Sequence, residues 1–102
     1  MLNADQEQQE IARIKMPRGN EQFGIVTAML GAGKLHVDCE DGKKRLGRII
    51  GKIKKRVWIR AGDLVILTPW VVQSDEKCDI KWKYTNTQAN YLKRTGKIKF
   101  EQ

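Results

Sequence analysis

Residues 34–50 read KLHVDCEDGKKRLGRII, and this stretch decides the fold. Its first seven positions alternate between polar and apolar side chains, which is the pattern of a β-strand with one buried face. The dipeptide Asp41-Gly42 that follows predicts a two-residue hairpin turn, because a type I′ turn needs positive φ at both central residues. A second strand over residues 43–50 completes a β-hairpin.

Three further segments have strand character. Residues 23–30 end at the turn signal 31–33, residues 64–72 contain Pro69, which indicates an edge or a bulge, and residues 78–85 alternate again. In the last segment Cys78, Ile80, Trp82 and Tyr84 are expected to point inward. Five short strands at this spacing predict an all-β fold, a small five-stranded OB-type β-barrel, because closure removes exposed sheet edges.

The two ends of the chain differ from this central part. Residues 1–20 are polar and are interrupted by Pro17 and Gly19, so they predict a flexible N-terminal tail, part of it transiently helical. The barrel is expected over residues 21–85. One short C-terminal helix, capped by Asn86-Thr87 and ended by Gly96, is expected with a short tail over residues 86–102.

The net charge of the chain is strongly positive. Twenty Lys and Arg residues face twelve Asp and Glu residues, for a net charge of +8. Residues 43–60 carry nine of the basic residues and no acidic one, and apolar residues are interleaved with them. That mixture indicates cations fixed on a folded surface rather than a disordered tail, and nucleic acid is the partner that such a surface suits. A merely solvated face is the simpler alternative.

Other classes of function find little support. The sequence has one histidine, His36, which the strand pattern places on the outward, charged face, where it is solvated or faces a phosphate. Cys39 and Cys78 occupy inward positions, so neither a metal site nor a disulfide is expected, and no cofactor or catalytic residue is predicted. No apolar run is long enough to span a membrane and no signal peptide is evident, so we expect a cytoplasmic monomer.

Trp58 lies within the basic segment and leaves two interpretations open. It is either a core residue or an exposed ring that stacks on a base. The outward positions of residues 34–50 hold charged side chains instead of aromatic rings, unlike proteins that bind single strands by stacking. Contacts to phosphates and to RNA shape are therefore expected to dominate, which favours a structured RNA.

The segment 41–59, DGKKRLGRIIGKIKKRVWI, closely resembles the central part of the translation initiation factor 1A family of archaea and eukaryotes, relatives of bacterial initiation factor 1. The segments 29–35 and 79–96 resemble it also. The resemblance implies an OB-fold factor that binds the decoding A site of the small ribosomal subunit and promotes initiator-tRNA binding and assembly of the initiation complex. Its implied partners are rRNA of the small subunit, other initiation factors including a translational GTPase, and, indirectly, initiator tRNA.

The resemblance also implies which residues contact RNA. Family contacts lie on the hairpin and on the basic connector after it, and Arg18 matches the basic N-terminal tail of eukaryotic members. With His36 from the strand pattern, the candidate RNA-binding residues are Arg18, Lys34, His36, Lys43, Lys44, Arg45, Arg48, Lys52, Lys54, Lys55, Arg56, Trp58 and Arg60.

Two departures from the family pattern are visible. Residues 1–15 carry three acidic residues where eukaryotic members are basic, and the chain ends shortly after residue 98 where eukaryotic members continue into an acidic tail that engages the GTPase. The short form resembles archaeal members. Two other functions stay open from the residues alone: a general RNA-binding protein or RNA chaperone of the OB type, and a module that binds an acidic protein.

Overall fold

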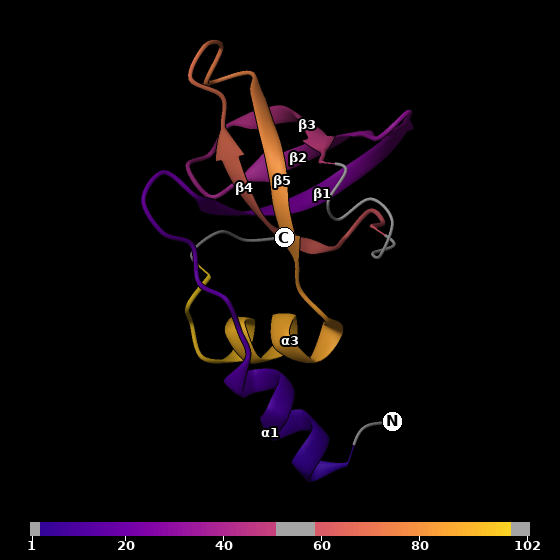
Figure 1. Ribbon diagram of the computed structural model, residues 1–102, viewed down its shortest axis with the longest axis vertical. Helices are drawn as coiled ribbons and strands as arrows, with labels where there is room; N and C mark the ends of the chain where they lie inside the picture. The colour runs from indigo at the N-terminus through magenta and orange to yellow at the C-terminus, as the bar shows by residue number, and fades with distance from the viewer. Residues whose placement is uncertain (1–2, 51–58, 99–102) are drawn as a thin grey trace.

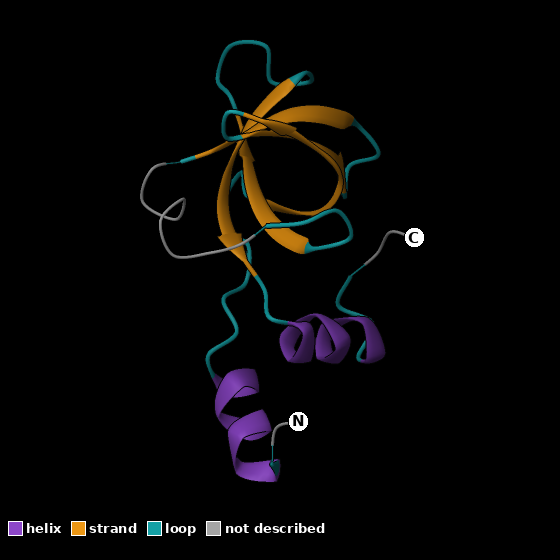
Figure 2. Ribbon diagram, turned by 90° about the vertical axis from the view of Figure 1, so that its right-hand side faces the viewer, coloured by secondary structure: helices purple, strands orange, loops and turns teal. Residues whose placement is uncertain are grey.

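The computed structural model describes residues 3–50 and 59–98. Its elements in chain order are α1 (Ala4–Ala12), β1 (Gln22–Gly31), β2 (Lys34–Cys39), β3 (Lys44–Ile49), β4 (Leu64–Pro69), β5 (Lys77–Lys83) and α3 (Asn86–Arg94). The strands close into a barrel in the order β1-β2-β3-β5-β4, and both helices lie below the barrel in Figures 1 and 2. The neighbouring strands described run antiparallel except β3 and β5, which are parallel. The predicted small five-stranded all-β barrel with a short C-terminal helix is confirmed.

The interior of the barrel is filled by the alternating side chains of β2 and their neighbours. Leu35, Val37 and Cys39 are buried there, as predicted, together with residues of β4 and β5. The strands approach closely at Gly24 of β1. A Cβ atom at this position would lie 2.6 Å from Val37 and 2.5 Å from Leu67, so only glycine fits without displacement of these side chains.

A second apolar cluster joins the outside of the barrel to α3. Leu64 and Ile66 of β4 point away from the barrel interior, because side chains alternate along a strand, and they pack with Leu92 of α3. Phe23 and Tyr84 complete the cluster, with ring centroids 5.9 Å apart. Strand β4 is therefore buried on both faces, which explains its unbroken apolar sequence.

A register shift in β5 changes which way its last residues point. Leu67 pairs with Ile80, but the adjacent Ile66 pairs with Trp82, so Lys81 is an extra, bulged residue. The bulge reverses the alternation, and Trp82 is 39% exposed. The predictions that Trp82 and Tyr84 point into the barrel are wrong for this reason, and Tyr84 is buried in the second apolar cluster instead.

Three local predictions also need correction. Strand β4 ends at Pro69 rather than at residue 72. In the hairpin between β2 and β3, the Cys39 amide donates to the Lys43 carbonyl, and residues 40–42 form the loop between these two residues. Positive φ occurs at Gly42 but not at Asp41, so the turn is not of type I′. The cap of helix α3 is Thr85 instead of the expected Asn86-Thr87.

The helix boundaries have clear causes. Thr85, rather than Asn86 or Thr87, caps α3: its side chain accepts from the Gln88 amide at 3.2 Å, and the Gln88 side chain accepts from the Thr85 amide at 3.1 Å. At the other end Gly96 has φ of +74°, and Lys97 donates to the carbonyl of Leu92, which is a Schellman motif. The predicted role of Gly96 is confirmed.

The N-terminal segment contains a helix that the sequence indicated only as transient. Asn3 and Gln6 exchange backbone-to-side-chain hydrogen bonds of 2.8 and 3.0 Å at the start of α1. Farther along, Ile14 packs against the second apolar cluster, and the Tyr84 hydroxyl donates to the Lys15 carbonyl. The flexibility of residues 1–20 and the expected boundaries at residues 21, 85 and 86 stay predictions.

Among the described residues no helix has the length and apolar character needed to cross a membrane. In the same residues no group of three His, Cys, Asp or Glu side chains is placed to hold a metal ion.

Candidate nucleic-acid interface

Strands β2 and β3 bring predicted RNA-binding residues together on the outer face of the barrel. Lys34 lies opposite Arg48, and residues paired in this way on antiparallel strands share a face of the sheet. His36 and Lys44 lie on the same face, opposite Leu46 and Asp38 respectively. Lys34, His36, Lys44 and Arg48 are all exposed. We call Lys34, Lys44 and Arg48 the hairpin cations, and His36 lies among them.

Arg48 is held in place by its neighbours on the adjoining strand and loop. Its Nε lies 3.1 Å and its Nη2 lies 3.2 Å from the two carboxylate oxygens of Asp79, and its guanidinium lies 5.3 Å from the centroid of the Trp70 ring. Trp70 Nε1 donates to the same carboxylate at 3.0 Å. Burial would raise the pKa of Asp79, but the hydrogen bonds from Trp70 and Arg48 outweigh it, and the pKa lies below its usual value. Arg48 is still 58% exposed.

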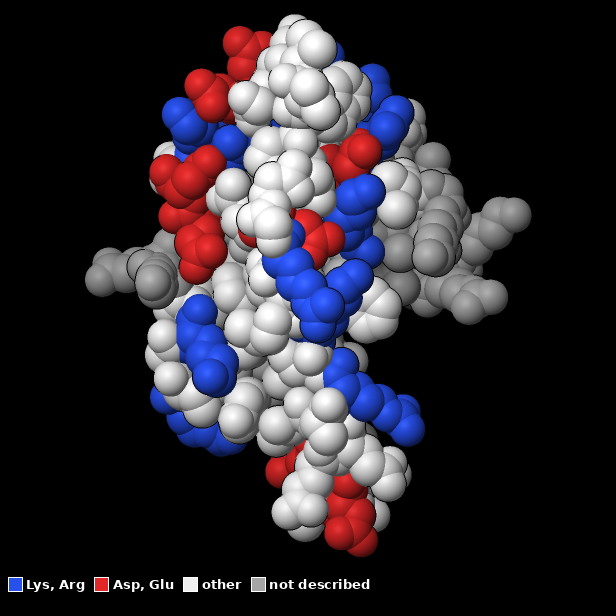
Figure 3. Space-filling view, turned by 60° about the vertical axis from the view of Figure 1, so that its left-hand side comes forward, with Lys and Arg blue, Asp and Glu red and all other residues white. Residues whose placement is uncertain are grey.

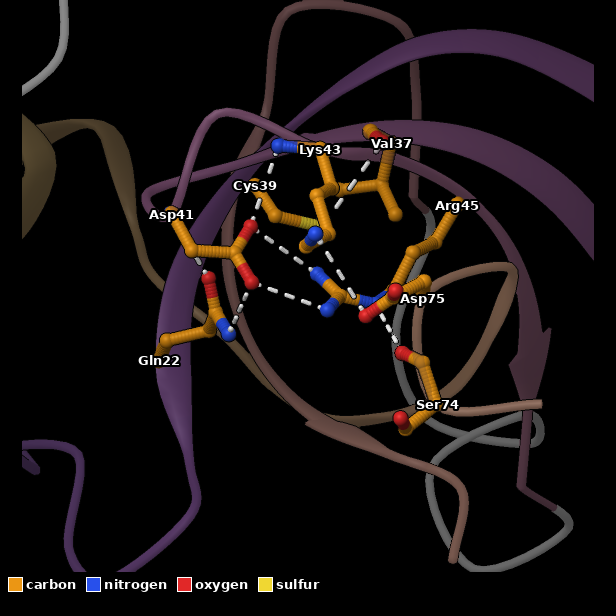
Figure 4. A network of polar contacts seen from close by, with 8 residues as sticks. All are labelled: Gln22, Val37, Cys39, Asp41, Lys43, Arg45, Ser74 and Asp75. Carbon is orange, nitrogen blue, oxygen red and sulfur yellow. Dashed lines mark hydrogen bonds and ion pairs between the residues drawn. The ribbon is translucent and has the colours of Figure 1, made fainter. Parts of the chain in front are cut away.

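Arg45 differs from the other predicted contacts because its side chain points inward. It lies opposite Val37 and is only 3% exposed. Figure 4 shows its guanidinium between Asp41 and the loop after β4: it donates to Asp41 at 2.8 and 3.1 Å and to the Ser74 carbonyl at 2.6 Å. This geometry fixes the hairpin turn to that loop, and it leaves Arg45 little surface with which to meet a phosphate.

The Arg45–Asp41 pair changes the acidity of both groups. The hydrogen bond from Arg45 is the main cause that lowers the pKa of Asp41 to about 2, and the bond to Asp41 raises the pKa of Arg45. The Asp41 carboxylate also accepts from the Lys43 amide at 3.0 Å. Lys43 is exposed, and its Nζ lies 3.5 Å from Asp75, a pair that the solvent screens.

The remaining candidates lie elsewhere or outside the described residues. Arg60 is exposed beside the turn into β4, where its amide donates to Asp63 at 2.8 Å. Arg18 is exposed in the segment between α1 and β1, away from the β2–β3 hairpin in the sequence. The positions Lys52, Lys54, Lys55, Arg56 and Trp58 fall outside the described residues, so their predicted role is carried only by the sequence. The chain re-enters the described part at Ile59, which is buried in the barrel interior.

Some cations that the sequence did not single out lie around the bulge in β5. Lys15 Nζ is 6.0 Å from the centroid of the Trp82 ring, and Lys15 and Lys81 line the same hollow. Lys15 is distant from β5 in the sequence, so no spacing rule could have joined them. Figure 3 shows basic side chains across the middle of the molecule with some acidic groups among them, and further acidic groups at the upper end and at the bottom.

The described residues do not form an activated nucleophile. Burial raises the pKa of the Cys39 thiol, and burial raises the pKa of the Cys78 thiol to about 12, so both stay protonated at neutral pH. The predicted inward positions of both cysteines are confirmed. The arrangement therefore places cations at fixed positions on a sheet, which suits binding of an anion rather than catalysis.

These features define the class. A barrel of five strands in the order β1-β2-β3-β5-β4, with β3 and β5 parallel, is an OB fold, here with an added C-terminal helix and a cationic hairpin. The family model for translation initiation factor 1A / IF-1 matches residues 1–102, and the chain belongs to that family. It is a translation initiation factor and not an enzyme.

Relatives support the assignment along most of the chain. The chain is 54% identical over 91 residues to translation initiation factor 1A of Methanothermobacter thermautotrophicus, covering 89% of this chain and 92% of the relative. It is 56% identical over 89 residues to the factor of Pyrococcus abyssi, covering 87% and 79%. It is 48% identical over 101 residues to that of Methanococcus maripaludis strain C5, covering 97% and 98%. The similarity to archaeal members is confirmed.

Solved structures agree on the fold. The solution structure of translation initiation factor 1 from the Wolbachia endosymbiont of Brugia malayi aligns with a TM-score of 0.51 and 23% identity, over 71% of this chain and 85% of that one. YjeQ from Thermotoga maritima aligns with a TM-score of 0.52 and 24% identity, over 64% of this chain and 23% of that one. At this identity the likeness concerns the barrel alone.

Proposed function

We propose that the protein binds the small ribosomal subunit at its decoding A site through rRNA phosphates, and thereby promotes initiator-tRNA binding and assembly of the initiation complex. Family membership supports the role in initiation. The observation that carries the mode of binding is the placement of Lys34, Lys44 and Arg48 on one face of a two-stranded ribbon. Cations fixed on one face in this way can meet phosphates of an RNA backbone.

Phosphate contacts are favoured over base stacking on this face. The described outer positions of β2 and β3 carry Lys, His, Asp, Leu and Arg side chains, and none of them is Phe, Tyr or Trp. The nearby Trp70 is occupied by its bond to Asp79 and by Arg48 above its ring. We propose further phosphate contacts at Lys43, Arg60, Lys52, Lys54, Lys55 and Arg56. Trp58 is proposed to contact the RNA by stacking or packing.

The roles within the hairpin divide into two kinds. Lys34, Lys43, Lys44 and Arg48 are proposed to touch RNA. Arg45 is proposed to hold the turn that presents Lys43 and Lys44, because its own hydrogen-bonding groups are occupied. His36 lies between Lys34 and Asp38 on the exposed face and is proposed to contact a phosphate or the sugar beside it.

The partners proposed for the cytoplasmic, monomeric factor are the rRNA of the small subunit and other initiation factors, a translational GTPase among them. The alternative is a general RNA-binding protein or chaperone of the OB type. The two differ in selectivity: the proposed factor prefers intact small subunits to bulk RNA, whereas the alternative binds both about equally.

A competition experiment tests this proposal. Fluorescently labelled protein is bound to archaeal small subunits and challenged with bulk RNA, then measured again at several salt concentrations. Lys34→Gln and Lys44→Gln should each lower the slope of log K against log salt by about 0.7–0.9, the value of one phosphate contact. Lys97→Gln, which removes an exposed charge beyond α3, serves as the control and should leave the slope unchanged. Equal affinity for bulk RNA would contradict the proposal, and unchanged slopes would remove these residues from it.

A further inference from the structure

Trp82 occupies an unusual position for a tryptophan of a barrel strand. The bulge at Lys81 turns its ring out of the barrel, and 39% of the residue is exposed. Among the described residues its polar neighbour is Lys15, whose Nζ lies 6.0 Å from the ring centroid. A partly exposed tryptophan with a single flexible lysine over its ring can take up a planar base when that lysine moves to the adjoining phosphate.

Lys15 connects this ring to a cationic hollow, because Lys15 lies over the ring and also lines the hollow, as does Lys81, the residue before Trp82. It has a volume of about 760 Å³ and lies between the segment after α1 and the outer side of strands β4 and β5. Lys15, Arg18 and Lys81 contribute positive charge to it, and Glu21 contributes negative charge, so the balance favours an anion. The spread of Lys and Arg side chains across this side of the molecule is visible in Figure 3.

One residue that lines the hollow has a polar atom without a partner. The hydroxyl of Thr68 is buried and makes no hydrogen bond within the described residues. A buried hydroxyl of this kind is unfavourable unless a ligand or water reaches it.

We propose that Trp82 and the hollow formed by Lys15, Arg18, Thr68 and Lys81 are a second RNA-contact site, at which an unpaired base stacks on Trp82 while the adjoining phosphates meet the lysines and the arginine. The inference rests on the proposed RNA-binding function and assigns to it a contact of a different kind. The hairpin cations are proposed to contact phosphates of the RNA backbone, whereas this site is proposed to bind one unpaired nucleotide.

The two kinds of contact predict different responses to salt. Stacking releases no counterions, so loss of the Trp82 ring should lower affinity without altering the salt dependence. Loss of Lys81 should instead lower the slope, by about 0.7 for a single strand. A purely structural role for Trp82 would change neither quantity once the protein is folded.

The test uses the full chain and two probes, archaeal small subunits and a fluorescein-labelled oligouridylate, with affinity measured by anisotropy. Trp82→Leu should bind oligouridylate about fivefold to a hundredfold more weakly at an unchanged salt slope, and Trp82→Phe should keep most of the affinity. Lys97→Gln is the matched control. Equal binding of wild type and Trp82→Leu to both probes would overturn the site.

A second measurement leaves the protein untouched, in case Trp82→Leu fails to fold. Oligodihydrouridylate carries the same charge as oligouridylate, but its saturated rings cannot stack, so the wild-type protein should bind it as weakly as the variant binds oligouridylate. Equal wild-type affinity for the two oligomers overturns the site. A wild-type protein that binds oligouridylate with this preference but ignores small subunits would support Trp82 and refute the ribosomal function, so the two failures are distinguishable.

Discussion

The guanidinium of Arg45 meets the carboxylate of Asp41 in a two-bonded pair of 2.8 and 3.1 Å, at the point where the β2–β3 hairpin turns. Arg45 is 3% exposed, whereas Asp41 is 34% exposed, so the pair lies at the edge of the barrel with the arginine buried. A third bond, from Arg45 Nε to the Ser74 carbonyl, joins the hairpin to the loop between β4 and β5. Lys43 and Lys44 therefore project from a turn that these three hydrogen bonds hold in place.

Removal of Arg45 should therefore cost stability. Arg45→Met removes both guanidinium bonds to the Asp41 carboxylate and the bond to the Ser74 carbonyl, and we expect the free energy of unfolding to fall by roughly 2–4 kcal/mol. Urea denaturation followed by circular dichroism measures this. The control is Lys43→Gln, which breaks only the exposed pair with Asp75 and should cost less than about 0.5 kcal/mol. Equal effects of the two substitutions would contradict the bracing role.

The same pair predicts a pH dependence. Asp41 has a pKa of about 2 in the folded protein, below its ordinary value of 3.8, so its contribution is complete above the ordinary value and is lost as the pH falls through about 2. Because Asp41 is partly exposed, we expect Asp41→Asn to destabilise by only about 1 kcal/mol at pH 7 and by almost nothing near pH 2. Unfolding of both proteins at the two pH values measures the difference.

The control for pH is Asp75→Asn, since the Asp75 carboxylate is 69% exposed and pairs with Lys43 alone among the described residues. It should differ from wild type by less than about 0.5 kcal/mol at both pH values. An Asp41→Asn effect that stays constant down to pH 2 would show that the ion pair does not contribute in the way described.

Helix α3 offers a test of its cap. Thr85→Ala removes one half of the capping box and should lower the free energy of unfolding by about 1 kcal/mol. Asn86→Ala changes the next residue, inside the helix, and should be neutral or slightly stabilising because alanine has the higher helix propensity. Thermal unfolding compares the two. The reverse order of effects would restore Asn86 as the cap.

The cysteines should be unreactive in the folded protein. Cys39 and Cys78 are buried, and a pKa of about 12 leaves Cys78 almost without thiolate at pH 8. Ellman's reagent should react with them at least about a hundredfold more slowly in buffer than in guanidinium chloride. Thr27→Cys places a thiol at an exposed position of β1 and should react quickly in buffer. Rapid reaction of the wild-type thiols would show that the barrel interior is open to the reagent.

The sequence predicted those features that depend on local patterns. Alternation and turn residues located the strands, and the cysteines were placed inward correctly. The cap at Thr85 could also have been found, because Thr85 and Gln88 have the spacing of a capping box. The turn type was missed because the Asp41 side chain accepts bonds from Lys43 and Arg45, and a three-residue loop with positive φ at Gly42 accommodates this.

Features that depend on pairing between distant strands were not predictable. A bulge at Lys81 appears only when the register of β5 against β4 is known, and it alone turns Trp82 outward. Arg45 looked like one more cation in a basic run, because its partner Ser74 is 29 positions away in the sequence. The strand alternation correctly placed Lys34, Lys44 and Arg48 on one exposed face, whereas their contact with RNA stays a prediction and the cations beside Trp82 were not anticipated.

Directed hydroxyl-radical probing tests the central proposal most directly. A single tethered iron–EDTA group at Lys34→Cys is feasible because the native thiols are buried. On archaeal small subunits the proposal predicts rRNA cleavage clustered around the decoding A site, suppressed by an excess of unlabelled protein. Cleavage confined to other regions of the subunit, or the same cleavage in the presence of that excess, would contradict the proposal.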